Sequence, residues 1–151
     1  MKNRLLICTT PTQVIFAKAA IKKLQKMNVR KCRDYILIIH PELSRDNKKL
    51  IHKLAKKLDY AGVLDFTGEI LNSYLKITTN IRRNIYLGNI NKYFQNTYRE
   101  YYNLQKKINI IVKDKIGNVD AVFYRDNYAK IDEFFITSLD NINKFYEIED
   151  G

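Results

Sequence analysis

The chain contains few of the residues that break secondary structure or build linkers. Among its 151 residues there are only two prolines and five glycines, and no segment is rich in serine, glycine or proline. Hydrophobic residues make up 46% of the sequence, which is enough to build a core and excludes a disordered chain. The length and the absence of a linker predict a single domain over residues 1–151.

Cysteine and histidine are also scarce. The two cysteines, Cys8 and Cys32, are too few for the disulfide framework of a small secreted domain and indicate reduced thiols. The two histidines, His40 and His52, share no zinc-type spacing with them, so the sequence predicts no metal site. His52 lies in a predicted amphipathic helix and is interpreted as a boundary residue without chemistry. The pair His40-Pro41 follows a predicted strand and is interpreted as a strand terminator, because proline ends a ladder.

Long hydrophobic runs are missing as well. A transmembrane helix needs about 20 apolar residues, and no segment approaches that length. The basic start at residues 1–4 leads into an apolar run that ends at Thr9, which is too short for a signal peptide. These absences predict a cytoplasmic protein. Peripheral contact with the anionic inner membrane is an added expectation, because the formal net charge is +11.

The positive charge is the main indication of partners. The sequence has 27 Lys and Arg against 16 Asp and Glu, spread along the chain, and most basic pairs fall where a helix faces solvent. Their summed field attracts phosphate or carboxylate groups, as in nucleotide sugars, acidic glycans or nucleic acid. A nucleic-acid-binding module or a non-enzymatic interaction module is therefore the rival interpretation, with tyrosines stacking on bases. The basic residues are not concentrated in one segment and no known binding motif occurs, which disfavours nucleic acid.

The first 67 residues alternate between strand and helix patterns. Apolar segments at residues 4–9, 35–39 and 63–66 predict three strands, and helical spacing predicts helices between them. The first helix has a capping box, with Thr10 as the cap, Pro11 at the first helical position and Gln13 three residues after the cap. Ser44 caps the second helix. This order predicts an α/β fold with a Rossmann-like parallel sheet and flanking helices.

The pattern is less regular after residue 67. Helices are predicted at residues 70–81 and 93–107, the second rich in tyrosines that are interpreted mainly as a core edge. The segments predicted to be extended are residues 85–87, 108–112, 121–124, 134–137 and 146–148.

Two polar segments follow the first and the last predicted strands. Because the carboxyl ends of parallel strands meet at one edge of a sheet, the loop at Thr10 and the terminal Glu149-Asp150-Gly151 are expected to lie together. The first helix also offers free N–H groups to an anion there. The loop lacks the glycines of a dinucleotide fingerprint, and the chain has no Walker-type lysine loop. The alternatives are a simple helix cap for Thr10 and a solvated acidic tail for the last residues.

Three motifs together resemble the N-terminal half of bacterial sialyltransferases, namely glycosyltransferase family 52 and the related capsular polysialyltransferases. They are the loop Thr10-Pro11-Thr12-Gln13, the strand and turn Ile85-Tyr86-Leu87-Gly88-Asn89, and Glu149-Asp150-Gly151. The resemblance implies the GT-B fold, in which two Rossmann-like domains face a cleft. It also implies that Asp150 or Glu149 is the general base on the acceptor hydroxyl, and Asp150 is the preferred candidate.

The resemblance further implies the substrates and the residues that bind them. The donor is CMP-sialic acid, the acceptor is a capsular or lipooligosaccharide glycan, and no metal, other cofactor or nucleic acid takes part. Gly151 lets the acceptor come close, and the other substrate-binding candidates are Thr10, Thr12, Gln13 and Asn89. The histidine-proline motif of the C-terminal nucleotide-sugar domain is missing here, so the chain is expected to be an acceptor-side domain that is inactive alone. Linkage and acceptor identity stay open.

Overall fold

A five-stranded parallel sheet forms the centre of the protein. The computed structural model describes residues 1–27, 31–86, 90–125 and 129–148, with the side chains of residues 84–86 and 90–96 left out. The strand order is β3-β2-β1-β4-β5, which is the order of a Rossmann-like fold and confirms the predicted fold class. The strands are β1 (Lys2–Ile7), β2 (Cys32–Ile38), β3 (Gly62–Asp65), β4 (Val119–Arg125) and β5 (Lys144–Ile148).

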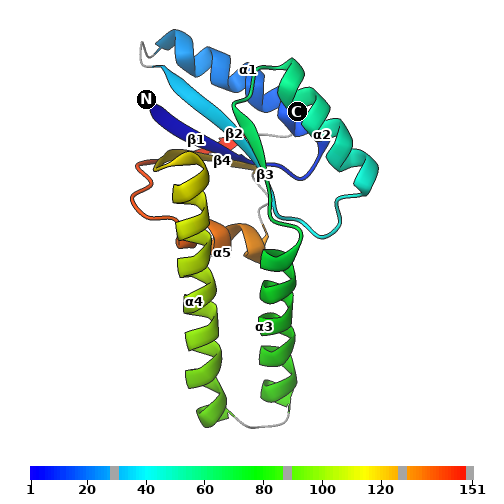
Figure 1. Ribbon diagram of the computed structural model, residues 1–151, viewed down its shortest axis with the longest axis vertical. Helices are drawn as coiled ribbons and strands as arrows, with labels where there is room; N and C mark the ends of the chain where they lie inside the picture. The colour runs from blue at the N-terminus through cyan, green and yellow to red at the C-terminus, as the bar shows by residue number, and fades with distance from the viewer. Residues whose placement is uncertain (28–30, 87–89, 126–128, 149–151) are drawn as a thin grey trace.

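Helices cover both faces of this sheet (Figure 1). Alternate side chains of β1 supply the two cores, because successive residues of a strand point to opposite faces. Leu6 joins the core beneath α1 and α2, whereas Leu5 and Ile7 join the core beneath the other three helices. The helices are α1 (Pro11–Met27), α2 (Arg45–Lys57), α3 (Glu69–Tyr86), α4 (Ile90–Ile116) and α5 (Lys130–Ser138).

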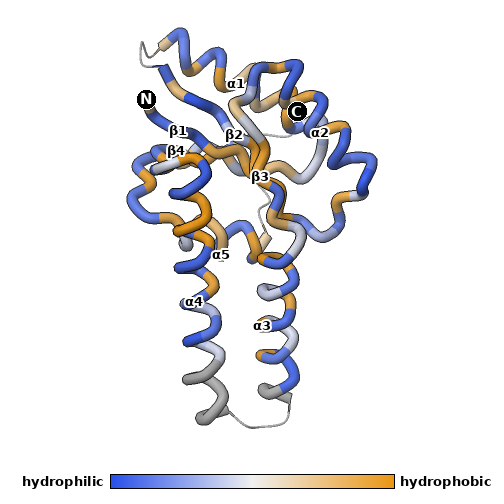
Figure 2. The backbone as a smooth tube through the Cα atoms, viewed as in Figure 1, coloured by the Kyte–Doolittle hydropathy of each residue, from blue (hydrophilic) through white to orange (hydrophobic). Residues whose placement is uncertain are grey.

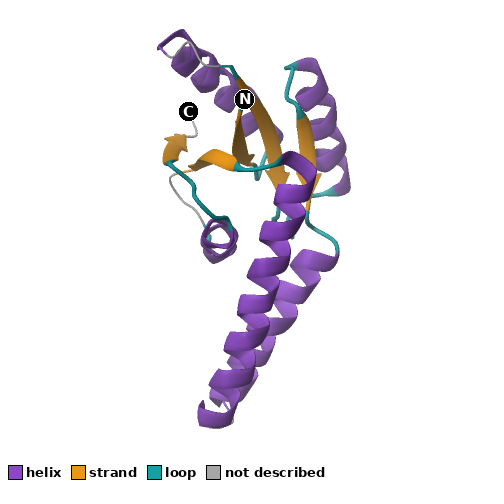
Figure 3. Ribbon diagram, turned by 60° about the vertical axis from the view of Figure 1, so that its left-hand side comes forward, coloured by secondary structure: helices purple, strands orange, loops and turns teal. Residues whose placement is uncertain are grey.

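Helices α3 and α4 form a long hairpin that extends past the carboxyl edge of the sheet (Figure 1). Hydrophobic residues of α4 gather where this helix meets the sheet (Figure 2). In the side view, the hairpin is seen apart from α5 (Figure 3).

The strand predicted at residues 108–112 is wrong, because these residues belong to α4. Ile108 and Val112 are buried one helical turn apart, whereas Ile110 between them is 66% exposed, which is the period of a helix.

Two other predicted strands are also wrong. Residues 134–137 belong to α5, and Ile85 and Tyr86 belong to α3. In α5, Phe134 and Phe135 are both buried, and Phe134 contacts the Tyr101 ring of α4 with centroids 4.4 Å apart. An apolar run of this length is compatible with a strand or a buried helix, and the packing against α4 decides between them. The strands predicted at 121–124 and 146–148 are confirmed as β4 and β5.

Tyr60 connects the end of α2 to α1. Its hydroxyl donates a hydrogen bond to the carbonyl oxygen of Val14 at 2.8 Å, and its ring lies 4.5 Å from the Lys18 ammonium. Burial, followed by the nearby Asp34 and Cys8, raises the pKa of the phenol well above its ordinary value. The hydroxyl is thus a permanent donor that fixes α1 to the segment before β3.

We expect Tyr60→Phe to lower the free energy of unfolding by about 1–2 kcal/mol, because one buried hydrogen bond is lost while the ring stays. Urea denaturation followed by circular dichroism measures the change. Tyr98→Phe is the matched control, since Tyr98 is 74% exposed, and it should shift stability by less than about 0.5 kcal/mol. Equal effects of the two substitutions would contradict a role for the buried bond.

Candidate functional site

The carboxyl edge of the sheet has the geometry of a ligand site. β1 is central, and it pairs in parallel with β2 on one side and with β4 on the other. The chain order reverses between β1 and β4, and open α/β sheets bind ligands at such a switch point, outside the carboxyl ends of the strands. The loops after β1, β2 and β3 and the start of α5 all meet this edge.

The loop after β1 is fixed by Gln13. Its Oε1 accepts hydrogen bonds from the Thr9 backbone N–H at 2.7 Å, the Thr9 hydroxyl at 2.9 Å and the Thr10 backbone N–H at 3.2 Å. The Gln13 backbone N–H donates to the Thr10 hydroxyl in return, at 3.4 Å. This confirms the predicted capping box. Gln13 is buried and shapes the loop, whereas Thr10 and Thr12 are exposed at the edge of the sheet.

A histidine and an aspartate form a buried polar contact at this edge. His40 Nε2 lies 2.7 Å from Asp132 Oδ1, and the side chains are 12% and 2% exposed. The second oxygen of Asp132 accepts a hydrogen bond from the Ala129 backbone N–H at 2.8 Å, which caps α5. Because β1 lies between β2 and β4, the pair connects the loops on both sides of the strand that leads to Thr9. We call this pair the His40–Asp132 dyad.

The sequence interpretation of His40 as a strand terminator was incomplete. β2 does end at Ile38, two residues earlier, but the imidazole also has a buried carboxylate partner. That partner is 92 positions away in the sequence, so periodicity and spacing could not find it. The usable signal was a histidine directly after a buried parallel strand, where the fold places ligands. His52, by contrast, is exposed on α2 and does not lie at the boundary of the core.

The end of β3 adds a second polar group. Asp65 accepts hydrogen bonds from the backbone N–H of Thr67 at 2.9 Å and from its hydroxyl at 2.5 Å, and Lys48 Nζ lies 3.7 Å from the other carboxylate oxygen. Burial alone would raise the pKa of Asp65. The Thr67 hydrogen bonds and the Lys48 ammonium outweigh burial and hold that pKa below its ordinary value. Asp65 is therefore an ionised group at neutral pH and not a proton donor.

The proposed acidic residues come directly after β5. Arg125 and Ile148, the last residues of β4 and β5, are register partners, so both strands end at the same edge. Glu149, Asp150 and Gly151 lie outside the described residues, and so does Asn89. The structure thus brings Thr10, Thr12 and Gln13 to the carboxyl edge and leaves the other predicted site residues unplaced.

Cys8 and Cys32 form no disulfide, and the Cys8 thiol donates to the Thr10 carbonyl oxygen at 2.9 Å. Within residues 1–27, 31–86, 90–125 and 129–148, no group of three or more His, Cys, Asp or Glu side chains is arranged to hold a metal ion. In the same part of the chain, no helix combines the length and apolar character needed to cross a bilayer.

Comparisons with protein families, with characterised proteins and with solved structures found no match.

Proposed function

We propose that this chain is the N-terminal, acceptor-side domain of a bacterial sialyltransferase. The reaction is transfer of sialic acid from CMP-sialic acid to a hydroxyl of a capsular or lipooligosaccharide glycan. One observation carries the proposal: β5 runs parallel to β4, and its last residue, Ile148, lies at the carboxyl edge, where a Rossmann-like sheet binds its ligands. The Thr10 loop and the His40–Asp132 dyad belong to the same edge.

In this proposal Asp150, or Glu149, accepts the proton of the acceptor hydroxyl. The hydroxyl oxygen forms a bond to the anomeric carbon of sialic acid while the bond from that carbon to the CMP phosphate oxygen breaks. The bonding electron pair leaves with CMP, and the carboxylate keeps the proton. A carboxylate within hydrogen-bond reach of the hydroxyl is sufficient for this step. A second, nucleotide-sugar domain would hold CMP across the cleft.

The described residues supply the acceptor side of the site. A sialylated acceptor carries a carboxylate, which cationic groups at the edge can attract. Arg125, the last residue of β4, has a buried Nε without a hydrogen-bond partner among the described residues and is our candidate for that contact. His40, whose ring Asp132 holds through Nε2 at 2.7 Å, is our candidate for positioning the acceptor. The overall charge of +11 favours an acidic glycan in the same way.

The substrate class is tested with the 151-residue chain and two glycans. Saturation-transfer NMR should show binding of sialyllactose and much weaker binding of lactose, which lacks the carboxylate. Arg125→Gln should reduce the sialyllactose signal, and Arg99→Gln, an exposed arginine on α4, should not. Binding of RNA with steep salt dependence and no preference for sialyllactose would support the nucleic-acid module instead.

The base is tested in a two-domain enzyme made by joining this chain to the nucleotide-sugar domain of a family 52 sialyltransferase. We expect Asp150→Asn to lower kcat for sialyl transfer by about 10²- to 10⁴-fold, the usual contribution of a general base, with little change in KM. Glu149→Gln shows whether its neighbour takes the role. Glu100→Gln, an exposed acid on α4, is the control and should leave kcat unchanged. Full activity of both Asp150→Asn and Glu149→Gln would contradict the proposal.

A further inference from the structure

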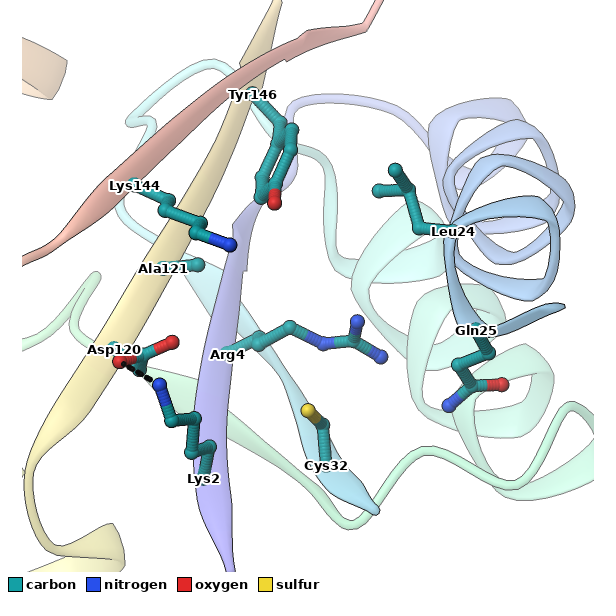
Figure 4. A pocket seen from close by; sticks show the side chains of 9 residues that line it. All are labelled: Lys2, Arg4, Leu24, Gln25, Cys32, Asp120, Ala121, Lys144 and Tyr146. Carbon is teal, nitrogen blue, oxygen red and sulfur yellow. Dashed lines mark hydrogen bonds and ion pairs between the residues drawn. The ribbon is translucent and has the colours of Figure 1, made fainter. Parts of the chain in front are cut away.

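A second candidate site lies at the opposite, amino edge of the sheet. A cavity of about 250 Å³ opens there between the last turns of α1 and the starts of β1, β2, β4 and β5. Figure 4 shows the guanidinium of Arg4, the ammonium of Lys144 and the hydroxyl of Tyr146 directed toward the same space. None of these residues belongs to the carboxyl edge. We call this space the amino-edge cavity.

Arg4 is the reason to regard the cavity as a binding site. It is buried, with 8% of its surface exposed, and its Nε donates to Asp34 Oδ1 at 2.7 Å. Its Nη2 is also buried but has no hydrogen-bond partner among the described residues. Buried polar groups nearly always have a partner, and a guanidinium N–H that lacks one is ready to donate to an anion.

The position of Arg4 is fixed by packing. Its Cζ lies 5.7 Å from the centre of the Phe123 ring, and Phe123 stacks on Tyr146 with ring centroids 4.9 Å apart. Asp34, its register partner on β2, holds the other side of the guanidinium. The guanidinium that lines the cavity is therefore pre-organised, and binding costs little side-chain entropy.

The cavity and its supporting residues carry an excess of positive charge. Lys2 pairs with Asp120 at 2.9 Å, and Lys18 lies 3.8 Å from the Asp34 carboxylate that Arg4 also contacts. Hydrogen bonds from Asn143 and Lys2 are the main causes that lower the pKa of Asp120, and the nearby Lys144 ammonium adds to the effect. Four cationic side chains thus face two carboxylates, Asp34 and Asp120. Two positive charges remain for a ligand, which matches one dianion.

We propose that the amino-edge cavity binds a phosphate monoester group. A phosphate dianion matches the two excess positive charges. Its oxygens can accept hydrogen bonds from the Arg4 guanidinium, the Lys144 ammonium and the Tyr146 hydroxyl. The volume is below that of a site for a drug-sized ligand, so the phosphate is attached to a small group or is the exposed end of a larger molecule. This site is independent of the proposed transferase function.

Inorganic phosphate is the first probe, titrated into the 151-residue chain by calorimetry and by ¹H–¹⁵N NMR at constant ionic strength. Lys144→Ala should weaken phosphate binding about five- to tenfold, since Lys144 is exposed and its loss leaves the fold intact. Arg4→Lys keeps the positive charge but removes the planar guanidinium, which can donate two parallel hydrogen bonds. It should weaken phosphate binding at least as much as Lys144→Ala does. Lys22→Ala, on the exposed side of α1, is the control and should have no effect beyond twofold.

Vesicles separate the two sources of the phosphate group. Sedimentation with phosphatidic acid vesicles that is lost in Lys144→Ala and retained in Lys22→Ala assigns the site to a lipid headgroup. Phosphate binding without vesicle binding assigns it to a soluble phosphate monoester. The proposal is overturned if the wild-type chain binds no phosphate, if Lys144→Ala and Lys22→Ala weaken binding equally, or if NMR shifts spread over the basic surface and spare β1 and β5. If Arg4→Lys does not fold, the Lys144→Ala comparison decides alone.

Discussion

Asp34→Ala is expected to lower the free energy of unfolding by about 3–5 kcal/mol. Asp34 is buried and is the carboxylate that Arg4 contacts at 2.7 Å, with Lys18 at 3.8 Å. Its removal leaves a buried guanidinium without a counter-ion, and breaking a buried ion pair on one side costs about this much. Urea denaturation followed by circular dichroism gives the value.

The control for Asp34→Ala is Asp46→Ala, which removes an exposed carboxylate from the first turn of α2. It should cost about 0.3–1 kcal/mol, the contribution of one acid at a helix N-terminus. If the amino-edge cavity binds phosphate, then phosphate should restore part of the stability of Asp34→Ala, because a ligand that binds only the folded state stabilises it. A loss below about 1 kcal/mol in Asp34→Ala would show that Arg4 does not depend on this partner.

Asp132→Ala is expected to lower the free energy of unfolding by about 2–4 kcal/mol. Asp132 is almost fully buried, and its two oxygens serve different partners, His40 Nε2 at 2.7 Å and the Ala129 N–H at 2.8 Å. The substitution removes a helix cap, at about 1 kcal/mol, and a buried charge-assisted hydrogen bond, at about 1.5–3 kcal/mol. Thermal and urea unfolding measure the loss.

Glu133→Ala is the matched control, since it removes an acid from the next position of the same helical turn, where the side chain is exposed. It should change stability by less than about 1 kcal/mol. NMR of the His40 ring gives a second readout: its signals should move in Asp132→Ala and stay in place in Glu133→Ala. Equal losses of stability in the two variants, with an unchanged His40 spectrum, would show that the dyad does not hold the ring.

Local sequence signals predicted the first half of the fold well. The capping box at Thr10 and Gln13 and the cap at Ser44 are both present, with the Ser44 side chain accepting from the Asn47 N–H at 3.2 Å. These signals act over three or four residues, so they can be read from sequence directly. The wrong strands lie in α3, α4 and α5, where isoleucine, valine and phenylalanine runs are compatible with either structure and packing against a neighbouring element decides.

The candidate sites depend on contacts that sequence patterns do not contain. Helical spacing predicts that most basic pairs face solvent, but it gives no partner for Arg4, which is buried because Asp34 lies beside it on the neighbouring strand. The contact between His40 and Asp132 could be predicted only by knowing that α5 begins next to the carboxyl edge. The strand order predicts which loops meet, and it does not specify which side chains in those loops are paired. Burial of a charged group becomes predictable only when its partner is known.

The central position of β1 has a consequence for how the chain reaches its native state. β1 pairs with β2 through Leu5 and Tyr35, but it pairs with β4 through Leu5 and Val122, after the α3–α4 hairpin has been made. Contacts between distant segments form slowly, because a long loop has to close first. The segment from β1 to β3 can therefore assemble early during synthesis, while the edge of β1 that pairs with β4 is still unpaired. We therefore expect the pairing of β4 with β1 to be the slow step of folding.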